Sequence, residues 1–272
     1  MTGERLDVAL VAAGLARSRT AAAAAVAAGR VRVDGRPATR PGVRVAESSR
    51  LDVDADDGWV GRAAHKLDDA LTAFDVPVAG RLALDLGAST GGFTQVLLRR
   101  GARRVVALDV GHDQLVPALR ADPRVLVVEG ENARHLTATR LAELTGDEER
   151  PDVVVADLSF ISLALVLPAI AAVGSANADV VCLVKPQFEV GRERVRGGLV
   201  RDPAARAEAV ARVLDAANGV GLRAVALRAS GTPGTHGNRE ALVHLHRSRG
   251  RDPAEWTGSI AAVVRGPDGE AR

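Results

Sequence analysis

The sequence predicts an α/β protein whose main part is a seven-stranded, doubly wound sheet, preceded by a small α+β unit. Three observations support this prediction. From Arg62 onward, strand-like apolar runs alternate with helical patterns, as in sheets built with crossover helices. The run at residues 82–86 leads through a loop of small residues into a helix, a connection that presents backbone N–H groups to ligands. Ahead of both, residues 1–44 hold eight arginines against three acids, although the net charge of the whole chain is only +2.

The first 55 residues have the pattern of a compact helix–helix–strand unit. Two stretches with helical spacing each end at a glycine, and two strand-like stretches follow them. Ser18 stands where it can cap the second helix, and Asp34-Gly35 marks a turn. These elements are expected at residues 5–14, 19–28, 30–36 and 41–53.

Within this segment, a set of residues forms a recognisable pattern. The set includes Arg5-Leu6-Asp7, Leu10, Gly14, Ser18-Arg19, Val31, Val33, Asp34-Gly35 and Pro41. On these residues the segment resembles the S4 RNA-binding domain, which implies binding to the shape and phosphates of structured RNA. The arginines expected to contact RNA are Arg5, Arg17, Arg19, Arg30, Arg32, Arg36 and Arg40. The alternative is a solvated basic face on a small helical cap.

The composition shifts after this unit and suggests the domain boundaries. Residues 1–55 are the expected S4-like domain, residues 56–62 the linker, and residues 63–247 the sheet domain. Residues 248–272 form a C-terminal extension to which the sequence assigns no role. The seven strands are expected at residues 82–86, 104–109, 125–128, 152–157, 180–185, 222–229 and 240–246.

Composition also narrows the cellular setting. A single cysteine excludes an intramolecular disulfide and fits a reducing compartment. The first residues lack the hydrophobic core of a signal peptide, and the longest apolar run, residues 163–173, is too short to span a bilayer. A soluble, cytoplasmic protein without a membrane partner is therefore expected.

The loop that follows residues 82–86 is the clearest candidate for a ligand site. It consists of Asp85, Gly87, Ser89, Thr90, Gly91, Gly92 and Phe93, with Leu86 and Ala88 between them. No Gly-Lys-Ser/Thr closes it, so it is not a P-loop, and it lacks the second glycine of the Gly-x-Gly-x-x-Gly dinucleotide pattern. A nucleoside ligand without a pyrophosphate fits better, and S-adenosylmethionine is the commonest of these. The alternative is a tight turn without a ligand.

Polar residues also stand at the ends of the following strands, where ligands of such sheets bind. Asp109 is placed to accept hydrogen bonds from ribose hydroxyls, and Asn132 to meet an adenine edge. Asp157 and Lys185 end the fourth and fifth strands. Helix capping is the alternative for Asp109 and Asp157, and a turn role for Asn132. Cys182 lies inside a predicted buried strand and is expected to act as a small apolar side chain rather than a nucleophile.

Lysine is rare in this chain. Lys66 and Lys185 are the only lysines among 36 basic residues. A lysine can lose its proton when it is desolvated or close to another cation, whereas an arginine effectively cannot. Arginine-rich codon usage with two accidental lysines is the alternative, which the position of Lys185 at a strand end weakens. The six histidines lack metal-ligand spacing with other donors, so no metal site is predicted.

Taken together, several stretches carry a resemblance that extends to about residue 247. They are Arg62-x-x-His65-Lys66-Leu67, residues 85–94, Asp109-Val110-Gly111, Asp157-Leu158-Ser159-Phe160-Ile161-Ser162, Lys185-Pro186-Gln187-Phe188-Glu189 and Gly237-Asn238-Arg239-Glu240. On these stretches the chain resembles the TlyA-type ribosomal RNA 2′-O-methyltransferases, also called haemolysin A, which join an S4 domain to an FtsJ-like methyltransferase. The resemblance implies S-adenosylmethionine as cofactor and a cytidine of 16S or 23S ribosomal RNA, within ribosomal subunits, as substrate. It also implies a catalytic tetrad of Lys66, Asp157, Lys185 and Glu240.

A ribose hydroxyl is a weak nucleophile and needs a base nearby. Lys185 is the candidate base, with Asp157 and Glu240 orienting the lysines and the hydroxyl. Burial and a neighbouring cation favour a neutral amine, whereas a close carboxylate favours the ammonium ion, and the sequence leaves that balance open. The target nucleotide must also be splayed from its helix. Phe160 and Phe188 are expected either to stack on it or to pack in the core.

Two other functional classes compete with this hypothesis. One is a non-catalytic RNA-binding or assembly factor that retains the nucleoside pocket, against which the intact tetrad argues. The other, suggested by the name haemolysin, is a cytolysin, against which the missing export signal and the absence of a spanning segment argue. The sequence indicates neither the modified nucleotides nor the oligomeric state.

Overall fold

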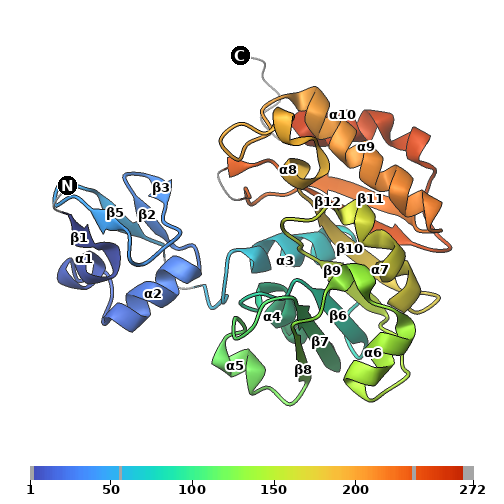
Figure 1. The fold of residues 1–272 in the computed structure, drawn as a ribbon, viewed down its shortest axis with the longest axis horizontal. Coiled ribbons are helices and arrows are strands. Elements are labelled where there is room, and N and C mark those ends of the chain that lie inside the picture. Colours follow the sequence, from blue (N-terminus) through green and yellow to red (C-terminus); the bar gives the residue numbers. More distant parts are fainter. Residues whose placement is uncertain (1–2, 55–56, 235–236, 266–272) are drawn as a thin grey trace. The chain divides into compact units, whose positions relative to one another are not determined.

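A computed structural model describes residues 3–54, 57–234 and 237–265 of the chain (Figure 1). The chain divides into two compact units, residues 1–64 and residues 65–272. Part of the predicted linker, residue 56, and residues 266–272 of the predicted extension lie outside the described residues.

The first unit packs two helices against short antiparallel strands. Its helices are α1 (Leu6–Ala12) and α2 (Arg19–Ala27), and its strands are β1 (Glu4–Arg5), β2 (Val31–Val33), β3 (Arg36–Pro37), β4 (Arg44–Val45) and β5 (Leu51–Val53). Strand β2 pairs with β3 and β5, and β1 pairs with β4. The hydroxyl of Ser18 accepts a hydrogen bond from the backbone N–H of Ala21 and caps α2 as predicted. The stretch at 41–53 was expected as one strand, but a turn closed by Ser49 N and Ala46 O divides it into β4 and β5.

The second unit contains the predicted seven-stranded sheet, in the order β11-β12-β10-β9-β6-β7-β8. Its strands are β6 (Leu82–Leu86), β7 (Arg104–Asp109), β8 (Val125–Glu129), β9 (Val153–Ala156), β10 (Asp179–Val184), β11 (Arg223–Ala229) and β12 (Ala241–His246). Strands β8, β7, β6, β9 and β10 are parallel, and β12 runs antiparallel to both of its neighbours. The fold class is therefore confirmed, with one antiparallel strand inserted between β10 and β11.

Helices cover both faces of this sheet. Alternate strand residues join one large apolar cluster with residues of α6 (Ala138–Thr145), α7 (Leu167–Val173), α9 (Pro203–Gly219) and α10 (Thr257–Arg265). Helix α4 (Gly92–Arg99) contacts β6 and β7, and its buried residues lie outside that cluster, on the other face (Figure 1). Cys182 lies inside the cluster, where burial raises the pKa of its thiol to about 12. It therefore acts as a small apolar side chain there.

Most of the predicted C-terminal extension belongs to the core of the second unit. Trp256, Ile260 and Val264 are buried in the large cluster, and α10 packs against α9 and β11. The guanidinium of Arg251 lies 3.9 Å from the centre of the Trp256 ring, a cation–π contact. Residues 248–265 thus complete one layer of the sheet domain rather than standing apart from it.

A buried carboxylate organises the end of the sheet from which β10 starts. Asp179 accepts a hydrogen bond from His244 Nε2 at 2.8 Å and from Arg81 Nη1 at 2.7 Å, and it is also paired with Arg249. Burial alone raises the pKa of Asp179, but the bonds from His244 and Arg81 outweigh burial and lower it to about 2. The carboxylate therefore stabilises the fold as long as it is ionised.

This cluster predicts a loss of stability in acid. Because the pKa of Asp179 is lower in the folded chain than in the unfolded chain, its contribution is complete above about pH 4 and is lost as the pH falls toward 2. We expect Asp179→Asn to lose about 2 kcal/mol of unfolding free energy at pH 6 and to show a flatter dependence below pH 4. Urea unfolding across this pH range measures both effects.

The matched control is Asp122→Asn, which removes a partly exposed carboxylate at the surface that is paired with the exposed Arg124. An exposed pair contributes little to stability. Equal losses in the two variants would contradict the role given to burial at Asp179.

Candidate active site

The central feature of the second unit is the point where its strand order reverses. From β6 the chain adds β7 and β8 on one side, and it then returns to add β9 and β10 on the other. The loops after β6 and β9 diverge at this point, which is where open α/β sheets bind their ligands. A cavity of about 860 Å³ lies there. It is lined from the ends of five strands by residues that include Gly87, Ser89, Asp109, Val110, Glu131, Asn132, Asp157, Leu158, Phe160 and Phe188.

The loop after β6 approaches the loop after β9 too closely for a side chain. At Gly87, where φ is +85°, an added Cβ would lie 2.9 Å from the carbonyl oxygen of Asp157. Gly91 caps α4 with φ +101°, and a Cβ there would meet Leu119 at 2.3 Å. Both glycines are therefore required by left-handed backbone and by close packing. They hold the N-terminal turn of α4 next to the cavity.

Asp109 fixes the shape of this loop. Its carboxylate accepts hydrogen bonds from the backbone N–H of Ser89 at 2.8 Å and of Gly111 at 2.7 Å. Asn132 uses its side-chain oxygen to cap the short helix that follows, by accepting from the N–H of Arg134 at 3.0 Å. Asp109 caps no helix among the described residues, and both residues line the cavity in addition to making these backbone hydrogen bonds.

The structure brings together about half of the residues predicted to hold the cofactor. Gly87, Ser89, Asp109, Asn132 and Asp157 line the cavity. The others lie behind the loop or at the start of α4, namely Asp85, Thr90, Gly91, Gly92 and Phe93. The Phe93 side chain is only 3% exposed and packs as part of α4. The sequence could not show this burial, because Phe93 is a single apolar residue next to two glycines.

Asp85 is a buried carboxyl group at the end of β6. One of its oxygens accepts from Thr94 Oγ1 at 2.6 Å, and the other is buried without a hydrogen-bond partner among the described residues. Burial and, to a lesser extent, the nearby charges of Asp157 and Asp109 raise the pKa of Asp85 to about 7, against the hydrogen bond from Thr94 that lowers it. A cationic ligand close to the loop would therefore favour ionisation of Asp85.

These features fit S-adenosylmethionine. The cavity is large enough for a nucleoside, and carboxylates from three strand ends, Asp109, Glu131 and Asp157, line it. The unpartnered oxygen of Asp85 adds a further acceptor behind the glycine loop. A sulfonium and an ammonium group carry the positive charges that such an acidic site favours.

The four residues of the predicted tetrad form two ion pairs. Lys66 Nζ lies 2.6 Å from Glu240 Oε2, and both side chains are almost completely buried. Lys185 Nζ lies 2.6 Å from Asp157 Oδ1 and donates to Ser159 Oγ at 2.9 Å. The sequence pattern gave no role to Ser159, although it stands two residues after Asp157.

Strand register explains why these pairs meet at one edge. Asp157 follows the end of β9, Lys185 follows the end of β10, and Glu240 precedes the start of β12. Because Val184 stands opposite Ala241, Lys185 and Glu240 leave the sheet at neighbouring positions. The sequence analysis placed all three inside strands. The structure puts each of them one residue outside, where the side chain is no longer held in the sheet.

A second buried carboxylate braces the two loops that carry Asp157 and Lys185. Glu189, in α8 (Pro186–Glu189), accepts from Ser162 Oγ at 2.6 Å and from the backbone N–H of Leu163 at 2.7 Å. Burial raises the pKa of Glu189, and these two bonds oppose that rise. Its motif was part of the resemblance, but no sequence signal distinguished a brace from a surface acid.

Phe160 stands out from the core. Its side chain is 93% exposed and its backbone has φ +65°, which is unusual for a bulky residue. The Phe160 and Phe188 rings pack with their centres 5.4 Å apart at the rim of the cavity. Of the two readings that the sequence left open, the structure therefore contradicts core packing for Phe160.

In the first unit, the predicted RNA-contacting arginines fall into two groups. Arg5 and Arg19 bind the buried carboxylate of Asp7, and the hydrogen bond from Arg5 is the main reason that the pKa of Asp7 is lowered. These two arginines hold the fold together. The others include exposed side chains, namely Arg17, Arg32, Arg36 and Arg40, and the partly buried Arg30.

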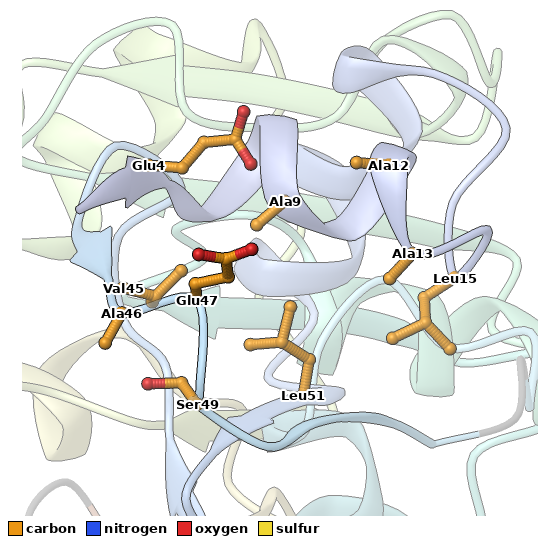
Figure 2. A pocket seen from close by; sticks show the side chains of 10 residues that line it. All are labelled: Glu4, Ala9, Ala12, Ala13, Leu15, Val45, Ala46, Glu47, Ser49 and Leu51. Atoms are coloured by element: carbon orange, nitrogen blue, oxygen red, sulfur yellow. The ribbon is translucent and has the colours of Figure 1, made fainter.

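One face of this unit is unsuited to RNA. A hollow of about 540 Å³ beside α1 has an apolar floor and two carboxylates (Figure 2). Figure 2 shows Glu4 and Glu47 facing the same hollow as Ala9 and Leu51. Carboxylates repel anions such as phosphate, and none of the exposed arginines of this unit lines the hollow.

Known families match both units. The model of the FtsJ-like methyltransferase family matches residues 59–247, and that of the S4 domain matches residues 4–51. The chain is 52% identical, over 250 residues, to a Mycobacterium tuberculosis protein named 16S/23S rRNA (cytidine-2′-O)-methyltransferase TlyA. This match covers 91% of each chain.

Solved structures agree with this match. A Streptococcus thermophilus protein described as a hemolysin is 37% identical and superposes with a TM-score of 0.74, over 97% of this chain and 95% of that one. A Listeria monocytogenes protein described as an S-adenosylmethionine-dependent methyltransferase has a TM-score of 0.51 at 13% identity, covering 69% of this chain and all of that one. At that identity the likeness extends to the fold alone.

Two other properties can be stated for the described residues. They contain no group of three or more His, Cys, Asp or Glu side chains arranged to hold a metal ion. None of their helices is both long and apolar enough to cross a membrane.

Asp85 generates a prediction for stability. Because its pKa is higher in the folded chain than in the unfolded chain, the wild-type protein loses stability as the pH rises from about 4 to about 7. We expect Asp85→Asn to remove this dependence and to raise the unfolding free energy at pH 8, by up to about 4 kcal/mol. Thermal and urea unfolding at pH 5 and pH 8 measure the difference.

As a control, Asp75→Asn changes an exposed carboxylate in a turn and should leave the pH dependence as it is. An Asp85→Asn protein that is less stable than wild type at pH 8 would show that the ionised carboxylate supports the fold, contrary to this account.

Proposed function

We propose that this chain, which belongs to the TlyA-type branch of the FtsJ-like methyltransferase family, methylates the ribose 2′-hydroxyl of a cytidine in ribosomal RNA. The family is established by the match over residues 59–247 and by the relative that is 52% identical. The acceptor and the cofactor are proposals that rest on the site and on that relative's name. The observation that carries them is that both lysines of the chain form ion pairs with carboxylates at strand ends, one of which, Asp157, lines the cavity.

The cavity at the strand reversal would hold S-adenosylmethionine. When bound, this cofactor supplies a methyl group on a sulfonium, which is already activated for transfer. Asp109 and Asn132 would meet its ribose and adenine, and Asp85 would lie behind its cationic part, at the glycine loop. Asp157 lines the cavity and also pairs with Lys185, so it connects the cofactor site to the acceptor site.

The chemistry left to the protein is alignment and removal of one proton. As the 2′-oxygen forms its bond to the methyl carbon, the carbon–sulfur bond breaks and the hydroxyl proton must be taken up. Lys185 Nζ is the proposed acceptor of that proton. Its contact with Asp157 Oδ1 at 2.6 Å holds this nitrogen beside the cavity that Asp157 lines. Ser159, which accepts from the same nitrogen, would keep Lys185 in place.

Lys66 and Glu240 would act through position and charge. Their pair is nearly buried and connects α3 (Ala63–Ala73) to the start of β12. Each side chain of a buried pair holds the other in place. Moving or removing one partner leaves the other as an uncompensated buried charge, which is costly. Glu240 would thereby orient the acceptor ribose beside Lys185.

The first unit would deliver the RNA. Its exposed arginines, including Arg17 and Arg40, suit contacts to phosphates. Ribosomal subunits are the proposed substrate form, and the target nucleotide must leave its stack to reach the cavity. The exposed ring of Phe160 at the rim supports this step, because an aromatic face can replace the stacking that the nucleotide loses.

The first test concerns the base. We expect Lys185→Arg to lower the rate of methyl transfer to ribosomal subunits by roughly 10²- to 10⁴-fold, because a guanidinium cannot accept the proton. Transfer of tritium from labelled S-adenosylmethionine measures the rate. Calorimetric titration with the cofactor should give an affinity close to that of the wild type.

Glu240→Gln keeps the size of the buried side chain and serves as the matched variant for the Lys66 pair. It should reduce the rate without releasing bound cofactor. Full activity in Lys185→Arg would refute the proposed base. If the wild type bound the cofactor but methylated neither subunit, an assembly factor would be the better description.

A second test concerns the exposed ring. We expect Phe160→Ala to lower kcat/KM for the RNA by roughly 10-fold or more, since stacking of a base on an aromatic side chain contributes about 1–3 kcal/mol. The unfolding free energy should change by less than about 0.5 kcal/mol, because the side chain is exposed. Phe160→Tyr keeps the ring and should keep the activity. Loss of activity only together with loss of stability would contradict a stacking role.

A further inference from the structure

A short hairpin follows α8 and lies outside the site described so far. It spans residues 190–201, and Arg196 and Leu199 form its bridge. Gly197 and Gly198 make the turn, with φ +59° and +79°. Two successive residues with positive φ are typical of a tight two-residue hairpin turn, so the backbone has a defined shape.

This hairpin has its own small core. Val190, Val200, Ala205 and Ala209 form a separate buried cluster, and Val195 packs against it. One of the hairpin's arginines, Arg194, is paired with Glu208 of α9. The inner side of the hairpin is therefore fixed to the sheet domain by apolar contacts and an ion pair.

Asn238 ties the hairpin to the catalytic end of the sheet. Its side-chain amide donates to Gly198 O at 2.6 Å, and its oxygen accepts from Val200 N at 3.2 Å. Asn238 is 2% exposed and stands two residues before Glu240. The other end of the hairpin follows α8, whose N-cap is Lys185. Both ends are thus anchored within a few residues of the tetrad.

Residues 190–201 carry four arginines against one acid, Glu193. Arg192, Arg196 and Arg201 are exposed, and the structure gives their guanidinium groups no hydrogen bond or ion pair to any described residue. Like charges held on a rigid hairpin repel each other, and a polyanion relieves that repulsion. The alternative is that these arginines are only part of a solvated surface. The two-glycine turn and the buried Asn238 argue against it, because a solvated surface does not require a fixed turn.

We propose that residues 190–201 bind the phosphate backbone of the RNA next to the target nucleotide, through Arg192, Arg196 and Arg201. This inference rests on the proposed function, because it takes RNA as the substrate. The first unit would then bind the RNA as a whole. The hairpin would hold the strand from which the target nucleotide is splayed. Free guanidinium groups suit this task because each can bind a phosphate through two hydrogen bonds.

The experiment compares three full-length proteins with the wild type. The first changes Arg192, Arg196 and Arg201 together to Gln, and the second changes the same three residues to Lys. The third is Arg223→Gln, which removes an exposed arginine at the start of β11, the opposite end of the sheet. Binding to ribosomal subunits and to protein-free ribosomal RNA is measured across KCl concentrations, with material from a strain that lacks this gene.

Counterion release gives the expected size of the effect. Each lost phosphate contact reduces the slope of log Kd against log salt by about 0.7, so the triple Gln variant should lose about 2. Its Kd for RNA should rise at least roughly 10-fold at 0.15 M KCl, while the triple Lys variant keeps most of the slope. The kcat of the triple Gln variant at saturating RNA and its affinity for S-adenosylmethionine should match those of the wild type.

An unchanged salt slope in the triple Gln variant, or a change no larger than that of Arg223→Gln, would overturn the proposal. Weaker binding to subunits with unchanged binding to protein-free RNA would also overturn it, because the partner would then be a ribosomal protein. A wild type that binds RNA through the hairpin but transfers no methyl group would refute the proposed function and leave the hairpin assignment standing.

Discussion

The parallel pairing of β6 with β9 is the constraint on which the site depends. Asp157 N donates to Leu86 O at 3.1 Å, so the last bond of this pairing joins the residue before the glycine loop to a tetrad residue. Just beyond it, the two loops pass so close that an added Cβ at position 87 would lie 2.9 Å from the carbonyl oxygen of Asp157, so this position requires glycine. The cavity and the Lys185–Asp157 pair are adjacent because Asp157, at the end of β9, belongs to both.

A second constraint follows from burying charge at this edge. Asp85 and Glu189 are carboxyl groups in low-dielectric surroundings, and burial raises the pKa of each. Lys66 and Glu240 are buried as a pair. Such groups cost stability, and proteins usually keep them where a charged or strongly polar ligand completes the arrangement. At the other end of β10, Asp179 shows the contrasting case, in which protein groups alone satisfy the carboxylate.

The sheet was predictable because its strands are short apolar runs with clear boundaries, and the predicted strands agree with the observed ones to within one residue at most ends. Strand order was not, because β12 enters between β10 and β11 against the direction of both. Lys66 and Glu240 are 174 residues apart, and only this insertion brings them together. Residue spacing likewise could not distinguish an exposed ring at Phe160 from a buried one at Phe93, since both are single aromatics beside small or polar residues.

Arginine replaces lysine completely outside the predicted tetrad, and this has a consequence for the way the protein responds to its surroundings. A guanidinium remains charged at every pH at which a protein is folded, so this part of the protein's charge is constant. Asp85 behaves differently, because burial raises its pKa to about 7 at the end of β6. The protein therefore keeps its arginine charge constant across the pH range in which this buried carboxyl group changes its own charge.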